Sequence, residues 1–188
     1  LNRQHAADEA GYRADTARWY PDKDIDQLMA LYPLSNYDTA GSADADMLGD
    51  QAFICTDQQV ADILINAGNA VYRYHFSQQV DSLLATLMPL VSSDPNPPTS
   101  GTVHTAEIPY VFGNQSIFGF FTTADHYRLS QPMIRYWTNF ARTGNPNDGR
   151  LPHWPRYDSS SQRFQRLDSP ISTGSHFKTA ECALWLSD

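Results

Sequence analysis

The chain has 188 residues, of which 41% are hydrophobic and 18% charged, a composition that can bury a core and excludes a disordered tail. Its 13 Lys and Arg against 21 Asp and Glu give a formal net charge of −8, which repels phosphate backbones, so nucleic acid is not an expected partner. No apolar run approaches the roughly 20 residues that a membrane-spanning helix requires, so we expect no membrane span.

The first third of the chain carries helix signals. A polar amphipathic helix is expected over about 5–19. A second, over 24–32, presents apolar residues at helical spacing to a core and is closed by Pro33. The stretch 34–46 is rich in Ser, Asn, Asp and Gly and predicts a loop. Apolar residues at helical spacing then predict a helix over 53–67.

Sheet signals begin after residue 70. The segment 70–76 has the aromatic and β-branched pattern of a strand, and 162–167 predicts a short edge strand. Between them, 78–102 begins apolar and ends in an irregular Pro/Ser-rich run, and the clearest amphipathic helix covers about 129–141. A terminal helix is expected over 177–186. Intermixed helices and strands favour an α/β architecture.

So few strands cannot complete a sheet, so the chain is expected to be part of a single domain, with no internal boundary over 1–188. Cys55 and Cys182 lie far apart, and no Cys/His cluster has metal-ligand spacing, so no metal site is expected. From the cysteine count alone, the two residues can be either two buried free thiols or one disulfide. Asn114-Gln115-Ser116 matches the N-glycosylation pattern, which, like a disulfide, indicates a secreted glycoprotein.

One histidine has the sequence context of a general base. His104 follows a Pro- and Gly-rich loop, precedes Glu107 by three residues and leads into the apolar segment 108–113, which would anchor the loop on a core. A loop histidine on a rigid base is how an imidazole is presented to a nucleophile. The competing interpretation is a structural or solvated histidine. The six histidines are His5, His75, His104, His126, His153 and His176.

The segment Gly101-Thr-Val-His104-Thr-Ala-Glu107-Ile-Pro-Tyr-Val-Phe-Gly113 is similar to the catalytic-histidine segment of the type-B carboxylesterase family, which includes cholinesterases, carboxylesterases and fungal lipases. Residues 136–147 resemble the family's helix and turn after this histidine, and 154–157 its Trp-Pro-x-Tyr segment. Residues 49–55 and 181–185 resemble the two segments that carry a disulfide in the cholinesterase branch. All occur in family order.

This resemblance implies the C-terminal part of an α/β-hydrolase fold, a mixed, mostly parallel sheet flanked by helices that is incomplete without an N-terminal segment. It implies hydrolysis of carboxylic esters by a serine esterase or lipase, through an acyl-enzyme and without a cofactor. His104 carries over as the base that takes the serine proton. Glu107 carries over as the acidic residue that follows the catalytic histidine in the family and steadies the loop or a buried water. The competing interpretation of Glu107 is a surface carboxylate. Cys55 and Cys182 carry over as the disulfide.

The chain departs from a complete enzyme because it holds no Gly-x-Ser-x-Gly elbow and no oxyanion-hole glycines, which the family places upstream. Asp8-Glu9-Ala10-Gly11 superficially resembles the family's acid segment, but Glu9 lies only 95 residues before His104, shorter than usual. Glu9 therefore stays open between the triad acid and a solvated helix residue. The expected partners are an ester substrate and an N-terminal fragment of the same precursor that carries the serine.

Two other classes of function stay open. A noncatalytic, cholinesterase-like adhesion or binding protein would keep the fold while lacking the nucleophile, and the residues preceding this segment would distinguish it. A self-contained binding domain, in which His104 is merely structural, would fold and remain monodisperse as 188 residues alone. Neither the acid nor the alcohol of the ester can be predicted from this segment.

Overall fold

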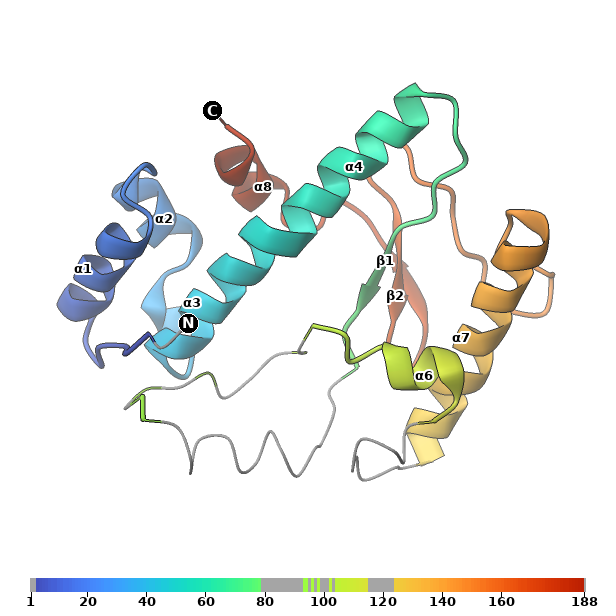
Figure 1. Cartoon of the computed structure of the whole chain (residues 1–188), viewed down its shortest axis with the longest axis horizontal. Helices are drawn as coiled ribbons and strands as arrows, with labels where there is room; N and C mark the ends of the chain where they lie inside the picture. Colours follow the sequence, from blue (N-terminus) through green and yellow to red (C-terminus); the bar gives the residue numbers. More distant parts are fainter. Residues whose placement is uncertain are drawn as a thin grey trace. The chain divides into compact units, whose positions relative to one another are not determined.

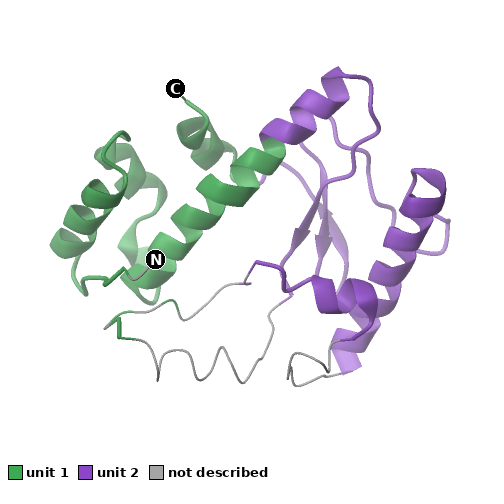
Figure 2. Cartoon of the chain, viewed as in Figure 1, with its two compact units in different colours: residues 1–58, 85–101, 178–188 green, residues 59–84, 102–177 purple. Residues whose placement is uncertain are grey.

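The computed structural model describes residues 3–78, 93, 94, 96, 98, 102, 104–114 and 124–187. They form two compact units, drawn in different colours in Figure 2: residues 1–58, 85–101 and 178–188 belong to unit 1, and residues 59–84 and 102–177 to unit 2. The assignment of 1–188 to one domain stays a prediction. No helix in the described ranges is both long and apolar enough to cross a membrane.

Unit 1 is helical (Figure 1). Its elements are α1 (Glu9–Trp19), α2 (Ile25–Leu31), the 3₁₀ turn η1 (Leu34–Asn36), α3 (Ala40–Gly49), the π-helical turn η2 (Asp50–Ile54), the first turn of α4 (Cys55–Asn66) and α8 (Thr179–Trp185). Side-chain caps fix where the first two helices begin: the Asp8 carboxylate accepts from the Gly11 amide, and the Asp24 carboxylate from two amides of α2.

The core of unit 1 gathers aromatic and aliphatic side chains around a disulfide. Cys55 at the start of α4 is bonded to Cys182 in α8, with the two Cα atoms 5.0 Å apart. Both are fully buried, as are Leu28 and Tyr32. The disulfide implied by the resemblance is therefore present in the structure, and the alternative of two free thiols is wrong.

The expectation of a loop over 34–46 is wrong from Ala40 onward. The Thr39 side chain accepts a hydrogen bond from the Ser42 amide and so starts α3, in which Ala40 and Ala43 are buried in the core of unit 1. Local composition favoured a turn, but side chains this small let the helix lie close against its neighbours, and packing outweighs intrinsic propensity.

The ends of other elements also differ from the prediction. The first helix begins at Glu9, four residues later than expected, because Asp8 caps it. The strand expected over 70–76 is confined to its last three residues, and the long helix begins at Ala124 instead of residue 129. Most of 78–102 lies outside the described residues.

The described part of unit 2 is built on a mixed sheet of three strands. Its strands are β1 (Tyr74–Phe76), β2 (Phe164–Leu167) and β3 (Ser172–Gly174), in that order. β1 pairs in parallel with β2, and the unexpected β3 pairs antiparallel with β2. The helices α6 (Ile108–Phe112) and α7 (Ala124–Thr143), drawn near this sheet in Figure 1, complete the unit together with the end of α4.

The core of unit 2 lies where the sheet meets α6 and α7. Phe76 and Leu167 from the strands pack with Tyr110 of α6 and with Met133 and Tyr136 of α7. Met133 is fully buried, as Leu28 is in unit 1. Leu28 and Met133 are therefore each covered within their own unit.

Gly174 in β3 is a packing constraint that can be tested. A Cβ at this position would lie 2.7 Å from Cε1 of the buried Phe164, whose ring also packs against the rings of His75 and Phe177. We expect Gly174→Ala to lower the free energy of unfolding by about 1–3 kcal/mol, the usual cost of overpacking a core.

The matched control is Gly49→Ala, because a Cβ at Gly49 at the end of α3 meets no atom within 4 Å. That change should be neutral or stabilising by up to about 1 kcal/mol, the helix propensity difference. Urea denaturation of both variants checks the pair; equal stabilities would contradict the close packing at Phe164.

Candidate active site

His104 lies in the turn over residues 104–107, immediately before α6, with its side chain exposed. Thr105 beside it has φ of +73°, a left-handed conformation that a β-branched residue rarely adopts. Such a conformation costs on the order of 1–3 kcal/mol and persists only where the surroundings impose it. The Ile108 amide closes the turn on the Thr105 carbonyl at 3.1 Å. The backbone around His104 is thus held in an uncommon shape.

The short helix α6 anchors this turn. Pro109 occupies its first turn, where a missing N–H costs nothing, and Gly113 ends it with φ of +67°. Tyr110 is 1% exposed, and its carbonyl accepts a 2.7 Å hydrogen bond from the Ser130 hydroxyl of α7. The apolar segment after His104 is therefore anchored on the core of unit 2, as expected from the sequence, but as a short helix.

Glu107 is half-buried at the end of the same turn. Its Oε1 accepts a hydrogen bond from the Tyr74 hydroxyl at 3.4 Å, which connects the turn to β1. Tyr74 was not singled out from the sequence, because its place in an alternating strand pattern says nothing about a partner 33 positions away. The structure thus brings His104 and Glu107 into one turn that α6 and β1 both hold.

The other candidate residues have separate places. Asn114 follows α6, and its buried Oδ1 accepts no hydrogen bond from the described residues; Gln115 and Ser116, the rest of the glycosylation pattern, lie outside them. Glu9 is an exposed residue in the first turn of α1, in unit 1. Because Asp8 caps that helix, the resemblance of Asp8-Glu9 to the family's acid segment has a structural explanation.

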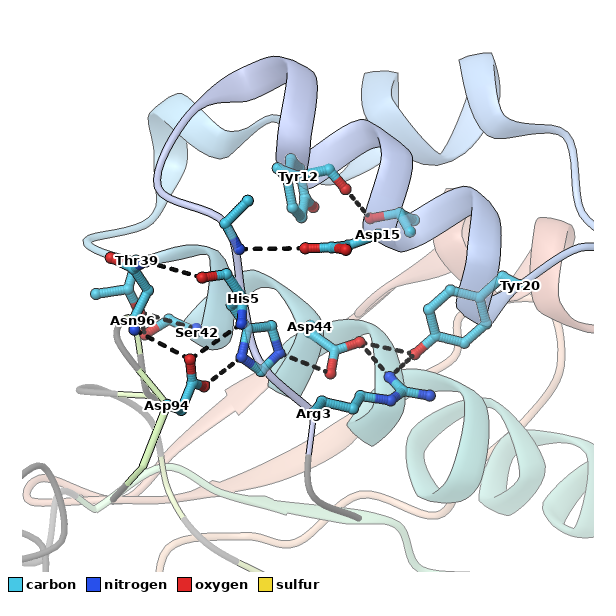
Figure 3. Close-up of polar contacts among 12 residues, drawn as sticks. Arg3, His5, Tyr12, Asp15, Tyr20, Thr39, Ser42, Asp44, Asp94 and Asn96 are labelled. Carbon is cyan, nitrogen blue, oxygen red and sulfur yellow. Dashed lines mark hydrogen bonds and ion pairs between the residues drawn. The ribbon is translucent and has the colours of Figure 1, made fainter. Parts of the chain in front are cut away.

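Sequence reasoning also missed a second histidine with carboxylate neighbours. His5, in unit 1, is 6% exposed and lies between Asp44 and Asp94 (Figure 3). No spacing rule connects residues 39 and 89 positions apart, so only the fold reveals the cluster. Among the residues that the structure describes, no group of three or more His, Cys, Asp and Glu side chains could hold a metal ion.

Comparison with known proteins decides the family. The chain matches the carboxylesterase family model over residues 4–185. The chain belongs to the carboxylesterase family. Carboxylesterase 5A of Canis lupus familiaris is 37% identical over 145 residues, which are 74% of this chain and 24% of that protein. Acetylcholinesterase of Gallus gallus is 35% identical over 142 residues, 74% of this chain and 17% of that protein. The family resemblance stated from the motifs is therefore confirmed.

A solved structure shows the fold of this carboxylesterase-family chain. A carboxylesterase of Geobacillus stearothermophilus is similar over 93% of this chain and 35% of its own, with a TM-score of 0.71 at 20% sequence identity. Together with the mixed sheet, this confirms the α/β-hydrolase fold in partial form. The chain spans about a quarter of the length of carboxylesterases 4A and 5A, the curated relatives it matches.

Proposed function

We propose that this chain is the histidine-bearing C-terminal part of a serine carboxylesterase or lipase that hydrolyses carboxylic esters through an acyl-enzyme. The observation that carries the proposal is the placement of His104: an exposed imidazole on a strained turn, braced by α6, in a chain of the carboxylesterase family. Relatives named carboxylesterase and fatty acyl-CoA hydrolase favour ester hydrolysis in general.

In the proposed mechanism, His104 serves as general base and then as general acid. A neutral imidazole accepts the proton of the serine hydroxyl as the serine oxygen attacks the ester carbonyl, and it returns that proton to the departing alkoxide. Water then repeats the sequence on the acyl-enzyme, which releases the acid and frees the serine. Serine alone is a weak nucleophile at neutral pH, so this proton transfer is required.

Glu107 has a positioning role in this proposal. Its hydrogen bond from the Tyr74 hydroxyl links the turn to β1, three residues after His104. A base that is misplaced by about 1 Å loses much of its rate advantage, so a contact that fixes the turn contributes indirectly. We expect a smaller effect from its loss than from the loss of the imidazole itself.

The serine, the oxyanion hole and the triad acid are proposed to lie on an N-terminal segment of the same precursor. Three observations favour this: the chain spans about a quarter of carboxylesterases 4A and 5A, the described part of the sheet has three strands, and α4 exposes large apolar side chains. Ile63 is 61% exposed, and Val60 and Leu64 flank it at helical spacing. A second polypeptide segment would cover such a face.

The isolated chain tests this partnership. Residues 1–188 expressed alone should aggregate or form a molten state, because the described part of the chain leaves the apolar face of α4 exposed. The measurement is urea denaturation followed by near-ultraviolet circular dichroism, with the complete protein as control. Cooperative unfolding of a monodisperse isolated chain would contradict the proposal and favour a self-contained binding domain.

The intact mass of the native protein, measured with and without denaturant, locates the partner segment. A noncovalent fragment should dissociate in denaturant, whereas a continuous precursor should keep one larger mass.

Secretion and a glycan at Asn114 are proposed as well: the Cys55–Cys182 disulfide is typical of an oxidising compartment.

A further inference from the structure

Ser130 lies on the buried face of α7, where helical spacing predicts an apolar residue. Leu129, Met133 and Tyr136 are buried on this face, and Ser130 is itself 1% exposed. A hydroxyl that is removed from water lowers stability unless it is hydrogen-bonded. The partner of this hydroxyl is the carbonyl of Tyr110 in α6, at 2.7 Å from Oγ.

The Tyr110 carbonyl is poorly satisfied within α6 itself. The last carbonyls of a helix have no amide partner one turn later, and α6 has five residues. The Asn114 amide, four positions after Tyr110, donates to the Pro109 carbonyl instead, and the Gly113 amide reaches the Tyr110 carbonyl only at 3.4 Å. The shorter bond from Ser130 therefore supplies the missing donor and ties α6 to α7, which lie side by side in Figure 1.

Two packing contacts join the same pair of helices. The ring of the buried His126, near the start of α7, meets the Tyr110 ring edge-on with centroids 5.8 Å apart. At the end of α6, a Cβ at Gly113 would lie 3.2 Å from Cδ1 of Ile134, so the backbone there runs close to α7. Ser130 lies between His126 and Ile134 in α7 and adds a hydrogen bond, whose geometry is directional, to these contacts.

Backbone hydrogen bonds connect α6 to the turn that carries His104. The Tyr110 amide donates to the Glu107 carbonyl at 3.0 Å, which joins the last residue of the turn to α6. Thr105, between His104 and Glu107, has φ of +73°, and a β-branched residue keeps such a conformation only where its surroundings impose it. Each step from Ser130 to this turn is a contact between described residues of unit 2.

We propose that Ser130 is a positioning residue of the esterase, which holds α6 against α7 and thereby keeps the His104 imidazole in the orientation that proton transfer requires. This inference rests on the proposed function of His104. The Ser130 hydroxyl acts through the backbone of α6 and of the turn, and it touches neither substrate nor the reacting atoms. Without this hydrogen bond the imidazole samples a wider range of orientations, on which the rate depends steeply.

Steady-state kinetics of Ser130→Ala in the complete protein test this role. We expect kcat on a p-nitrophenyl ester to fall about tenfold with KM within about twofold of wild type, because orientation of the base is impaired while ester binding is kept. The kcat is expressed per active serine, counted by the fluorophosphonate that the sample binds at completion, so that partial unfolding is not mistaken for slower catalysis. If Ser130→Ala does not fold, Ser130→Cys, whose thiol is a weak donor, replaces it.

Asn139→Ala is the matched control, because it also removes a buried hydrogen bond from α7 to a backbone carbonyl. The Asn139 side-chain amide donates at 3.1 Å to the carbonyl of Pro146, in the segment after α7 instead of in α6. This variant should keep the wild-type kcat per active serine. An equal loss of kcat in Asn139→Ala, or a folded Ser130→Ala protein with kcat within about twofold of wild type, would overturn the role of Ser130.

Amide hydrogen exchange separates this role from the proposed catalysis. Ser130→Ala should accelerate exchange by about fivefold or more at Tyr110, whose amide donates to the Glu107 carbonyl, whether or not the protein is an esterase. Asn139→Ala should leave exchange at this amide unchanged. Unchanged protection of Tyr110 in Ser130→Ala would overturn the role of Ser130 alone. Activity that survives loss of His104 would instead overturn the proposed function.

Discussion

Replacing His104 with alanine is expected to lower kcat by about 10⁴-fold or more on a p-nitrophenyl ester, because the serine proton then has no acceptor. KM should change little, since the imidazole contributes to proton transfer more than to binding. Steady-state kinetics of the complete, folded protein measure both.

His153→Ala is the matched control because His153 is also an exposed histidine of unit 2, outside the candidate turn. It should retain wild-type kcat. The kcat of Glu107→Ala should lie between those of His104→Ala and His153→Ala. Its expected loss of about tenfold in kcat corresponds to about 1.4 kcal/mol in the activation barrier. A His104→Ala protein within about tenfold of wild type would exclude the proton-transfer role.

The second large effect concerns the disulfide. Replacing Cys55 and Cys182 together with serine is expected to lower the free energy of unfolding by about 4–5 kcal/mol, on the loop-entropy model for a separation of 127 residues. Both positions are fully buried, so two serine hydroxyls also enter an apolar core. Urea denaturation under oxidising conditions measures the difference.

Reduction of the wild-type protein supplies the control for this variant. Wild type treated with reductant should lose most of the same stability, whereas the double-serine variant should not respond to reductant. A loss below about 1 kcal/mol would contradict the constraint assigned to this bond. Two alkylatable thiols in the unreduced, denatured protein would remove the disulfide altogether and weaken the case for secretion.

The fold could be predicted from the sequence where a pattern was long and periodic. The apolar stripe of α7 and the caps of α2 are local signals, and both elements lie close to their expected positions. α3 and β3 could not be predicted in the same way. α3 depends on how closely Ala40 and Ala43 approach neighbours, and β3 has three residues whose pairing with β2 is tertiary.

In the candidate site, too, local signals could be predicted and tertiary contacts could not. His104 and Glu107 could be singled out because a motif and a short spacing connect them. The contact of Tyr74 with Glu107 and that of His5 with Asp94 could not, since they join residues 33 and 89 positions apart. The left-handed backbone at Thr105 was also not predicted, because threonine carries no signal for positive φ.

The central claim is that His104 activates a serine that lies outside residues 1–188. A fluorophosphonate probe, which bonds covalently to an activated serine, tests it most directly when the labelled site is mapped by peptide mass spectrometry. The proposal predicts one labelled serine, outside these 188 residues, with labelling largely abolished in His104→Ala. A folded protein that is not labelled, or a label on a serine within residues 1–188, would contradict it.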